Sequence, residues 1–197
     1  MRTVLVERAA EMLAAREPVT LRALVRGTGA STMAVYTHFG GMDGLWSAVR
    51  QEGFDRLDRR LATVPRTDDP VRDLAALSAA YARSALDFPH LYRAMFDTRA
   101  ELTDPAVAGA SFGELVACAA RAGQAGRLAA GTDAEDIALR VWAAGHGLVL
   151  LVVTGVLPAA VLDRHSPPTL TALLVAAGDD PERCRSSVAV GWVAPAD

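Results

Sequence analysis

The segment 20–45, TLRALVRGTGASTMAVYTHFGGMDGL, constrains the fold more strongly than any other part of this 197-residue chain. It contains two short amphipathic stretches on either side of a turn that holds Gly27 and Gly29. Glycine readily adopts the positive φ angles that a tight reversal after a helix requires. The segment therefore predicts two short helices joined by a tight turn.

The first helix of this pair is predicted to begin after Thr20, whose hydroxyl can accept a hydrogen bond from a free amide of the first turn. Leu21, Leu24 and Val25 follow at the i, i+3, i+4 spacing of one apolar stripe. This stripe predicts that the helix packs against its neighbours on one side.

The second helix is predicted to begin after Ser31, with Val35 and Phe39 pointing back at the first helix. Gly40 and Gly41 are expected to end it. Its remaining residues, mostly polar, aromatic or small, face outward: Thr32, Met33, Ala34, Tyr36, Thr37 and His38. Such a face is typical of the recognition helix of a helix-turn-helix, which reads DNA. An ordinary helical hairpin with a solvated polar face fits the same spacing.

Helix signals continue through the rest of the chain, and the alternation of a strand occurs only in the short run 187–193. We therefore predict an all-α fold. The expected helices run from Asp43 to about Ala62, from Asp69-Pro70 to Phe88, over 90–96, from Asp104-Pro105 to Gly123, from a Thr132-x-x-Glu135 capping box through His146, and from Ser166-Pro167 through Ala177.

The run Val141–Leu157 has no charged residue in 17 positions. It is shorter than the roughly 20 residues that cross a bilayer, and it contains a histidine and three glycines. A helix that is apolar all round is more often buried in protein. The run is internal and lacks the layout of a signal peptide, so we expect no membrane association and a cytoplasmic location.

Charge is divided unevenly along the chain. Residues 1–50 carry six arginines against four acidic residues (net +2), and the remainder carries 14 arginines against 19 acidic residues (net −5). A weakly basic head on an acidic body fits a small DNA-reading domain attached to a domain of another function.

Nothing in the sequence indicates an enzyme. The four histidines are scattered, so no metal site is expected, and Cys118 and Cys184 lack CxxC spacing. The two cysteines are expected to be reduced, which leaves a redox sensor as a minor alternative. No phosphate-binding loop, nucleophile elbow or pair of catalytic carboxylates is found, and we expect no cofactor.

Residues 34–45, AVYTHFGGMDGL, resemble the recognition helix and following turn of the TetR family of bacterial transcriptional regulators. The pattern there is a small residue, an aliphatic, Tyr, any residue, His, Phe, and a turn into a long helix. Residues 2–13 are similar to the first helix of that family. In the second half, Trp142-x-x-x-His146-Gly147 and the segment 90–96 resemble a subset of TetR C-terminal domains.

The resemblance implies roles for the predicted reading face. Thr32, Met33, Ala34 and Thr37 would meet base edges, while Tyr36, His38 and Thr20 would touch the DNA backbone. Met42 departs from the family pattern, because many members have a phosphate-contacting lysine there. The chain also begins almost at its first helix, without a basic arm. Both departures predict fewer phosphate contacts and a shallower salt dependence.

The resemblance further implies a DNA-binding domain over 1–45 and a helical ligand-binding and dimerisation domain over 46–197, with 178–197 either a loose tail or folded onto the body. A homodimer would bind a palindromic operator. The expected dimer contacts are Leu148, Leu151, Val152, Leu170, Leu173 and Leu174. The expected lining of a small-molecule pocket is Tyr81, Phe88, Tyr92, Met95, Phe96, Phe112, Cys118, Trp142 and His146. Aromatic and methionine side chains at helical spacing are usually core residues, so each of these positions also has a plain core-packing reading.

The sequence thus predicts a DNA-binding transcriptional regulator, and the resemblance implies a dimer, most often a repressor in that family, that a small molecule releases from its operator. The alternative is a helical small-molecule binding or scaffolding protein whose DNA binding has weakened.

Overall fold

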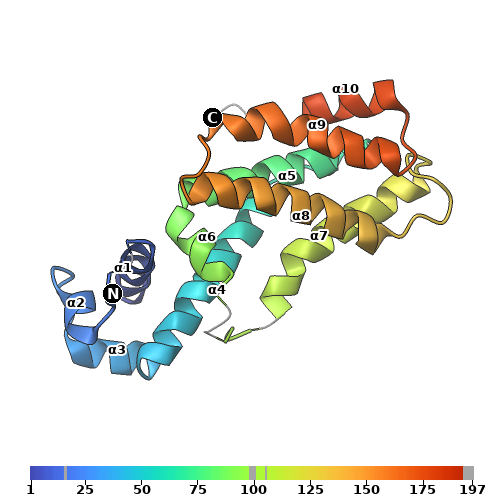
Figure 1. Cartoon of the computed structure of the whole chain (residues 1–197). Helices are drawn as coiled ribbons and strands as arrows, with labels where there is room; N and C mark the ends of the chain where they lie inside the picture. Colours follow the sequence, from blue (N-terminus) through green and yellow to red (C-terminus); the bar gives the residue numbers. More distant parts are fainter. Residues whose placement is uncertain (16, 98–100, 105, 193–197) are drawn as a thin grey trace. The chain divides into compact units, whose positions relative to one another are not determined.

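Helices form all the regular structure in the part of the chain that the computed structural model describes, namely residues 1–15, 17–97, 101–104 and 106–192. This confirms the predicted all-α fold. The helices form two compact units. Unit 1 comprises Met1–Leu57 and Asp87–Ala108, and unit 2 comprises Asp58–Leu86 and Gly109–Asp197 (Figure 1).

Unit 1 contains α1 (Arg2–Ala14), α2 (Leu21–Val25), α3 (Thr32–Phe39), most of α4 (Met42–Leu61) and α6 (Pro89–Met95). Helix α1 contacts both α2 and α6. The core of the unit is made of side chains without exposed area: Leu5, Ala9, Leu24, Val35 and Leu45. These side chains come from each of the first four helices, so the apolar stripes hold the short helices α2 and α3 in place.

The local signals of the sequence are found at the ends of α2 and α3. The Thr20 hydroxyl accepts a hydrogen bond from the amide of Ala23 at 3.2 Å, which confirms it as the N-cap of α2. Ser31 is the N-cap of α3, without a side-chain hydrogen bond. Gly40 ends α3 with a φ of 73°, a left-handed conformation that glycine adopts without steric cost.

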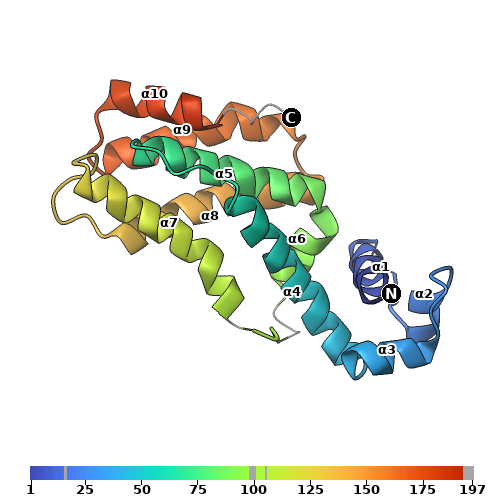
Figure 2. The same ribbon diagram turned by 180° about the vertical axis from the view of Figure 1, so that it is seen from behind.

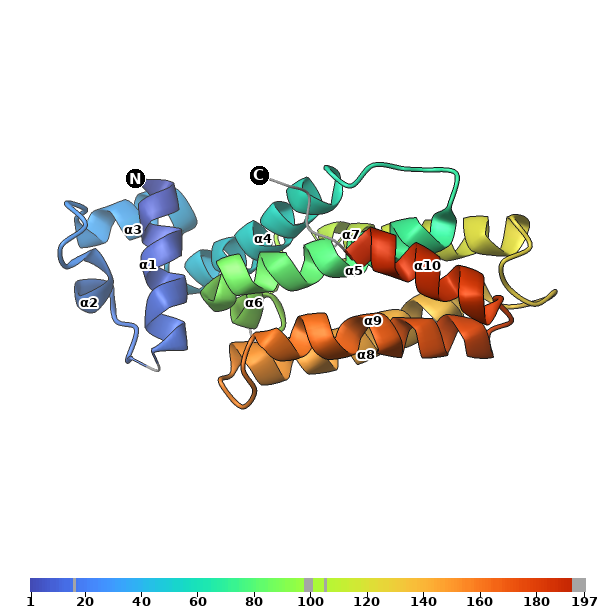
Figure 3. The ribbon, with the colours of Figure 1, turned by 90° about the horizontal axis from the view of Figure 1, so that it is seen from above.

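Unit 2 contains the end of α4, α5 (Pro70–Asp87), most of α7 (Ala106–Gln124), α8 (Ala134–Val153), α9 (Ala160–Ala176) and α10 (Pro181–Trp192). Helix α9 contacts α8 on one side and α10 on another (Figure 3). Figure 2 gives the view from behind, where α5 and α7 lie on the near side of this unit.

Two predicted helix starts were wrong. Helix α8 is capped by Asp133, whose carboxylate accepts from the amide of Glu135 at 2.9 Å, whereas the Thr132 hydroxyl donates to the carbonyl of Ala129. Helix α9 begins at Ala160, so Pro167 and Pro168 lie inside it. Proline usually breaks a helix interior because it lacks an N–H, which is why the sequence pattern placed the start at 166–167.

Residues 181–192 form a helix that packs on unit 2, rather than a loose tail or a strand. Helix α10 runs to Trp192, and it buries Cys184, Ser187, Val188 and Gly191. The last residue of the run 187–193, the remainder of the expected tail at 193–197, and Pro105 of the predicted Asp104-Pro105 start lie outside the described residues.

A buried ionic cluster fastens α10 to the rest of unit 2. The Arg127 guanidinium, 1% exposed, donates to both carboxylate oxygens of Asp179 at 2.6 and 2.8 Å and to Asp69 at 2.7 Å. The Ser187 hydroxyl of α10 donates to Asp69 at 2.5 Å. Burial alone would raise the pKa of Asp69, but the hydrogen bond from Ser187, backbone amides and the Arg127 charge together lower it.

Helix α8 is the one helix in the described ranges whose length and composition would allow it to cross a membrane. It contacts α9, and Ile137, Ala138, Val141 and Val149 are buried within unit 2. Core helices satisfy the same test, so this composition is weak evidence for a membrane span.

Candidate functional site

The outer face of α3 presents the side chains that the sequence singled out. Met33 is 66% exposed and Tyr36 is 52% exposed. Thr37 and His38 are exposed on the same helix, Thr20 is exposed at the start of α2, and Thr32 and Ala34 are half-buried. The helix carries no acidic residue, so nothing on it would repel a phosphate backbone.

The hydrogen bonding of Thr37 limits what it can offer to a partner. Its hydroxyl donates to the carbonyl of Met33 at 3.0 Å, one turn earlier in α3. With that proton used inside the helix, the oxygen remains as an acceptor. On a base edge it would match the amino group of adenine or cytosine.

Two exposed arginines that precede α3 in the sequence were not singled out by sequence reasoning. Arg22 and Arg26 are exposed on α2 and at its C-terminal cap, next in sequence to the turn that leads to α3. The signal that could have found them is the positive charge of residues 1–50 itself. Arg2 is instead engaged within unit 1, with its guanidinium 5.5 Å from the centre of the Phe39 ring.

The turn from α3 to α4 is closely packed. Met42 is half-buried against the core of unit 1, so the residue in the place of the family's lysine serves packing. A Cβ atom on Gly44 would lie 1.8 Å from the carbonyl oxygen of Phe39. Only glycine allows the first turn of α4 to approach the end of α3 this closely, which fixes how α3 is presented.

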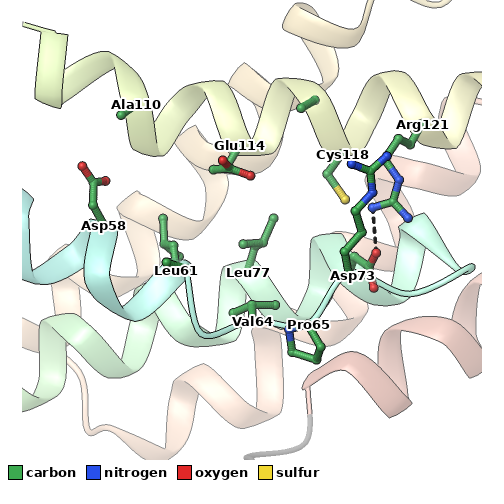
Figure 4. Close-up of a pocket in the computed structure, with 13 residues that line it drawn as sticks. Asp58, Leu61, Val64, Pro65, Asp73, Leu77, Ala110, Glu114, Cys118 and Arg121 are labelled. Atoms are coloured by element: carbon green, nitrogen blue, oxygen red, sulfur yellow. Dashed lines mark hydrogen bonds and ion pairs between the residues drawn. The ribbon is translucent and has the colours of Figure 1, made fainter.

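Unit 2 contains a cavity of about 440 Å³ between the C-terminal end of α4, helix α5 and helix α7 (Figure 4). Its floor is apolar, with Leu61, Val64 and Leu77. Helix α7 contributes one face at helical spacing: Ala110, Glu114, Ala117, Cys118 and Arg121. This volume lies in the range of small-molecule sites in proteins.

One end of the cavity holds a satisfied ion pair. The carboxylate of Asp73, a residue that is 3% exposed, accepts hydrogen bonds from Arg121 Nη1 at 2.8 Å and from the Thr67 hydroxyl at 2.6 Å. Cys118 lies beside this pair and donates to the carbonyl of Pro70 at 3.2 Å. Burial raises the pKa of the Cys118 thiol to about 12, so the thiol is neutral at physiological pH.

The structure separates the nine predicted pocket residues into three groups. Cys118 lines the cavity. Four others form a chain of contacts within unit 2: Phe112 to Trp142 with ring centres 6.0 Å apart, Trp142 to His146 at 5.7 Å, and the Tyr81 hydroxyl 2.8 Å from His146 Nδ1. The last four, Phe88, Tyr92, Met95 and Phe96, belong to unit 1.

Tyr92 and Met95 are buried in unit 1, Phe96 is half-buried and Phe88 is exposed. Tyr92 and Met95 are 4% and 3% exposed, and the rings of Tyr92 and Phe96 meet edge to face at 5.3 Å. The guanidinium of Arg56 lies 4.6 Å from the centre of the Phe88 ring. These contacts give the four residues a packing role in unit 1.

The imidazole of His146 is the group of the aromatic chain whose charge can change near neutral pH. Burial lowers its pKa below the ordinary value of 6.5. In its neutral form Nδ1 can accept the Tyr81 hydroxyl proton, which accounts for the contact between them. Sequence reasoning placed Trp142 and His146 on one helical face, and their ring contact agrees with that spacing.

The predicted dimer residues divide by burial. Val152, Leu170 and Leu174 are 9%, 5% and 0% exposed, so their side chains pack within the chain itself. Leu148 and Leu173 are half-buried, and Leu151 is 41% exposed. Helix α8 also exposes Leu139 and Leu150, by 49% and 40%. A second copy would therefore meet Leu139, Leu150 and Leu151 before any of the three buried side chains.

Comparison with known proteins shows similarity to one family model and to several solved structures. A family model described as the tetracyclin repressor-like C-terminal domain matches residues 74–183. A structure from Rhodococcus sp. RHA1 of unknown function is similar with a TM-score of 0.74 and 28% identity, covering 90% of this chain and 95% of the other. No curated protein matches the chain.

Two further similar structures are those of named proteins. The TetR family transcriptional regulator PfmR from Thermus thermophilus superposes with a TM-score of 0.72 at 17% identity, covering 87% of this chain and 97% of PfmR. RolR in complex with resorcinol superposes with a TM-score of 0.61 at 18% identity, covering 95% of this chain and 92% of RolR. At these identities the likeness concerns the fold.

The fold is that of a helix-turn-helix protein with a second, wholly helical unit in the described part of the chain. The family model covers more than half of the chain. The chain therefore belongs to the TetR family of transcriptional regulators.

Proposed function

We propose that this protein is a DNA-binding transcriptional regulator that acts as a dimeric repressor and leaves its operator when a small molecule binds. The observation that carries the proposal is the outer face of α3, where Met33, Tyr36, Thr37 and His38 are exposed on a helix without an acidic residue. In a major groove, Thr32, Met33, Ala34 and Thr37 would meet bases, and Thr20, Tyr36 and His38 would meet phosphates.

A dimer is supported by the exposed apolar side of α8. Leu139, Ala143, Gly147, Leu150 and Leu151 follow one another at helical spacing, and all of them are exposed in the single chain. Contiguous exposed apolar surface of this kind is typical of a contact between proteins. Two copies related by a two-fold axis would present paired recognition helices to a palindromic operator.

The proposed division of labour follows the two predicted domains, with residues 1–45 reading DNA and 46–197 binding the ligand and the second copy. The cavity of about 440 Å³ in unit 2 is our candidate for the ligand site. The structure of RolR with resorcinol supports the idea that this fold accommodates a small organic molecule. We further propose that the protein is located in the cytoplasm and has no enzymatic activity.

A gel shift at several salt concentrations tests the DNA-binding half of the proposal. The probe is DNA from beside the gene of this protein, with a random duplex of equal length as competitor. His38→Ala should weaken binding to both duplexes by about tenfold, because a phosphate contact is lost without loss of base reading. Thr37→Val should change the preference between duplexes instead.

The matched control is His90→Ala, which removes another exposed histidine of unit 1, on α6 and away from the reading face. It should bind DNA as the unaltered protein does. A protein that shows no preference over random duplex at low salt would contradict the proposal. That result would favour a helical small-molecule binding or scaffolding protein, an alternative supported by the loss of a phosphate-contacting lysine at Met42.

A further inference from the structure

We infer that the cavity of unit 2 binds an amphipathic organic cation, with the charged group beside Asp58 and Glu114 and the apolar body against Leu61, Val64 and Leu77. The inference rests on the proposed ligand response and specifies the chemical class of the ligand. It is carried by the distribution of charge and apolar surface along the cavity wall.

Asp58 and Glu114 give the cavity an acidic side. Asp58 projects from α4 and Glu114 from α7, and Figure 4 shows both at the cavity with Leu61 and Leu77 near them. Asp58 accepts a hydrogen bond from the hydroxyl of Ser111. Glu114 forms neither a hydrogen bond nor an ion pair with any residue that the structure describes. Its carboxylate is available to a ligand cation.

One of the two arginines that line the cavity is already paired with a carboxylate. Arg121 lies at the end opposite Asp58 in Figure 4, where it is paired with the buried Asp73 and donates to the carbonyl of Thr67. Arg66 is exposed and also borders a separate surface hollow with Thr67. An anionic ligand placed against Arg121 would meet the carboxylate of Asp73, whereas a cation between Asp58 and Glu114 would lie between two carboxylates.

The apolar floor indicates an organic cation rather than a metal ion. Leu61 and Leu77 are 7% and 8% exposed, so with Val64 they form a largely buried apolar wall against which a hydrocarbon body would pack. Within the described ranges, no group of three or more His, Cys, Asp or Glu side chains is arranged to hold a metal ion. A ring or short alkyl chain that bears an ammonium group satisfies both parts of the wall.

Three probes of matched shape test the inference by isothermal titration calorimetry on the full chain. Phenethylammonium, phenethyl alcohol and phenylpropionate share a phenyl ring on a two-carbon linker and differ in the charge of the head group. We expect the ammonium probe to bind about tenfold more tightly than the alcohol, and the carboxylate most weakly. Added salt should reduce the advantage of the ammonium probe.

Two variants locate the effect. Glu114→Gln and Asp58→Asn should each reduce the preference for ammonium over alcohol by roughly three- to tenfold and leave the affinity for the alcohol unchanged. Glu135→Gln removes an exposed carboxylate in the first turn of α8 and is the matched control, with no expected effect. Circular dichroism establishes that each variant is folded before titration.

The inference is overturned if the ammonium probe fails to bind at millimolar concentrations, if the alcohol or carboxylate binds as tightly, or if neither cavity variant alters the preference. Its failure is distinguishable from failure of the proposed function. A protein that prefers its own DNA but ignores the cation remains a regulator with another ligand. A protein that binds the cation without any DNA preference keeps this site and loses the regulatory role.

Discussion

On α3, buried and half-buried side chains alternate with exposed ones, and the buried side chains fix the direction in which the exposed ones point. Val35 has no exposed area, while Tyr36, its neighbour, is 52% exposed. The buried residue anchors α3 to the core of unit 1, and the exposed one is thereby directed outward at a fixed position along the helix. Anchoring and outward-facing side chains thus alternate within the eight residues of α3, the face proposed to read DNA.

His146 gives a residue-scale prediction about pH. Burial lowers the pKa of its imidazole in the folded protein, whereas the unfolded chain takes up a proton near the ordinary value of 6.5. Below that pH the unfolded state binds more protons than the folded state, so the free energy of unfolding should decrease as the pH falls below about 6.5. Urea unfolding of His146→Gln at a series of pH values should lack this decrease.

The control for this experiment is His165→Gln, which changes an exposed histidine of α9 and should preserve the decrease. If His146→Gln retained the full dependence between neutral and mildly acidic pH, another group would be responsible. The aromatic chain of Tyr81, Trp142 and His146 would then be a packing feature alone.

At the scale of elements, α10 depends on two kinds of contact with α5. The cluster of Arg127, Asp179, Asp69 and Ser187 joins it to the N-terminal end of α5. Gly191 allows close approach further along, since a Cβ atom there would lie 2.1 Å from the carbonyl oxygen of Arg72 and 2.8 Å from the Cβ atom of Ala75. The close packing of α10 on α5 therefore depends both on the absence of a side chain at Gly191 and on the ionic cluster around Arg127.

Gly191→Ala tests this packing. The added methyl group meets backbone that cannot move without displacing α10, so we expect the free energy of unfolding to fall by about 2 kcal/mol. Thermal unfolding followed by circular dichroism measures the change. Gly113→Ala on α7 is the matched control, because its Cβ atom would meet nothing within 4 Å; it should stabilise the chain by about 0.5–1 kcal/mol. Equal stability of the two variants would contradict close packing of α10 on α5.

At the scale of the whole molecule, the proposed dimer should depend on the exposed side of α8. Leu151→Glu places a charge at the C-terminal end of that apolar surface, so a dimer would have to bury an unpaired carboxylate. We expect a monomer in sedimentation velocity at micromolar concentration, with DNA affinity reduced by at least roughly tenfold because half of the paired contact is lost.

Val190→Glu is the control for this change, since Val190 is 51% exposed on α10 and lies outside the proposed contact. It should leave both the molecular mass and the DNA affinity unchanged. If Leu151→Glu remained dimeric while Val190→Glu became monomeric, the second copy would have to be placed on α10 instead.

The sequence by itself determined the features that depend on neighbours within a few turns. The N-cap at Thr20, the glycine that ends α3, and the apolar spacing of Leu24 and Val35 are set by local backbone and helix geometry. The all-α fold follows from the same periodicity repeated along the chain. The α3 reading face remains a prediction, and it was drawn from these local signals.

Only the tertiary structure decided where distant segments meet. The cavity combines Leu61, Leu77 and Glu114 from three helices, and the Arg127 cluster joins residues as far apart as Asp69 and Ser187. No spacing rule relates such positions, because their proximity depends on how whole helices pack. For the same reason α9 tolerates two prolines in its interior and α10 is a folded helix, since packing in the assembled unit outweighs local propensity.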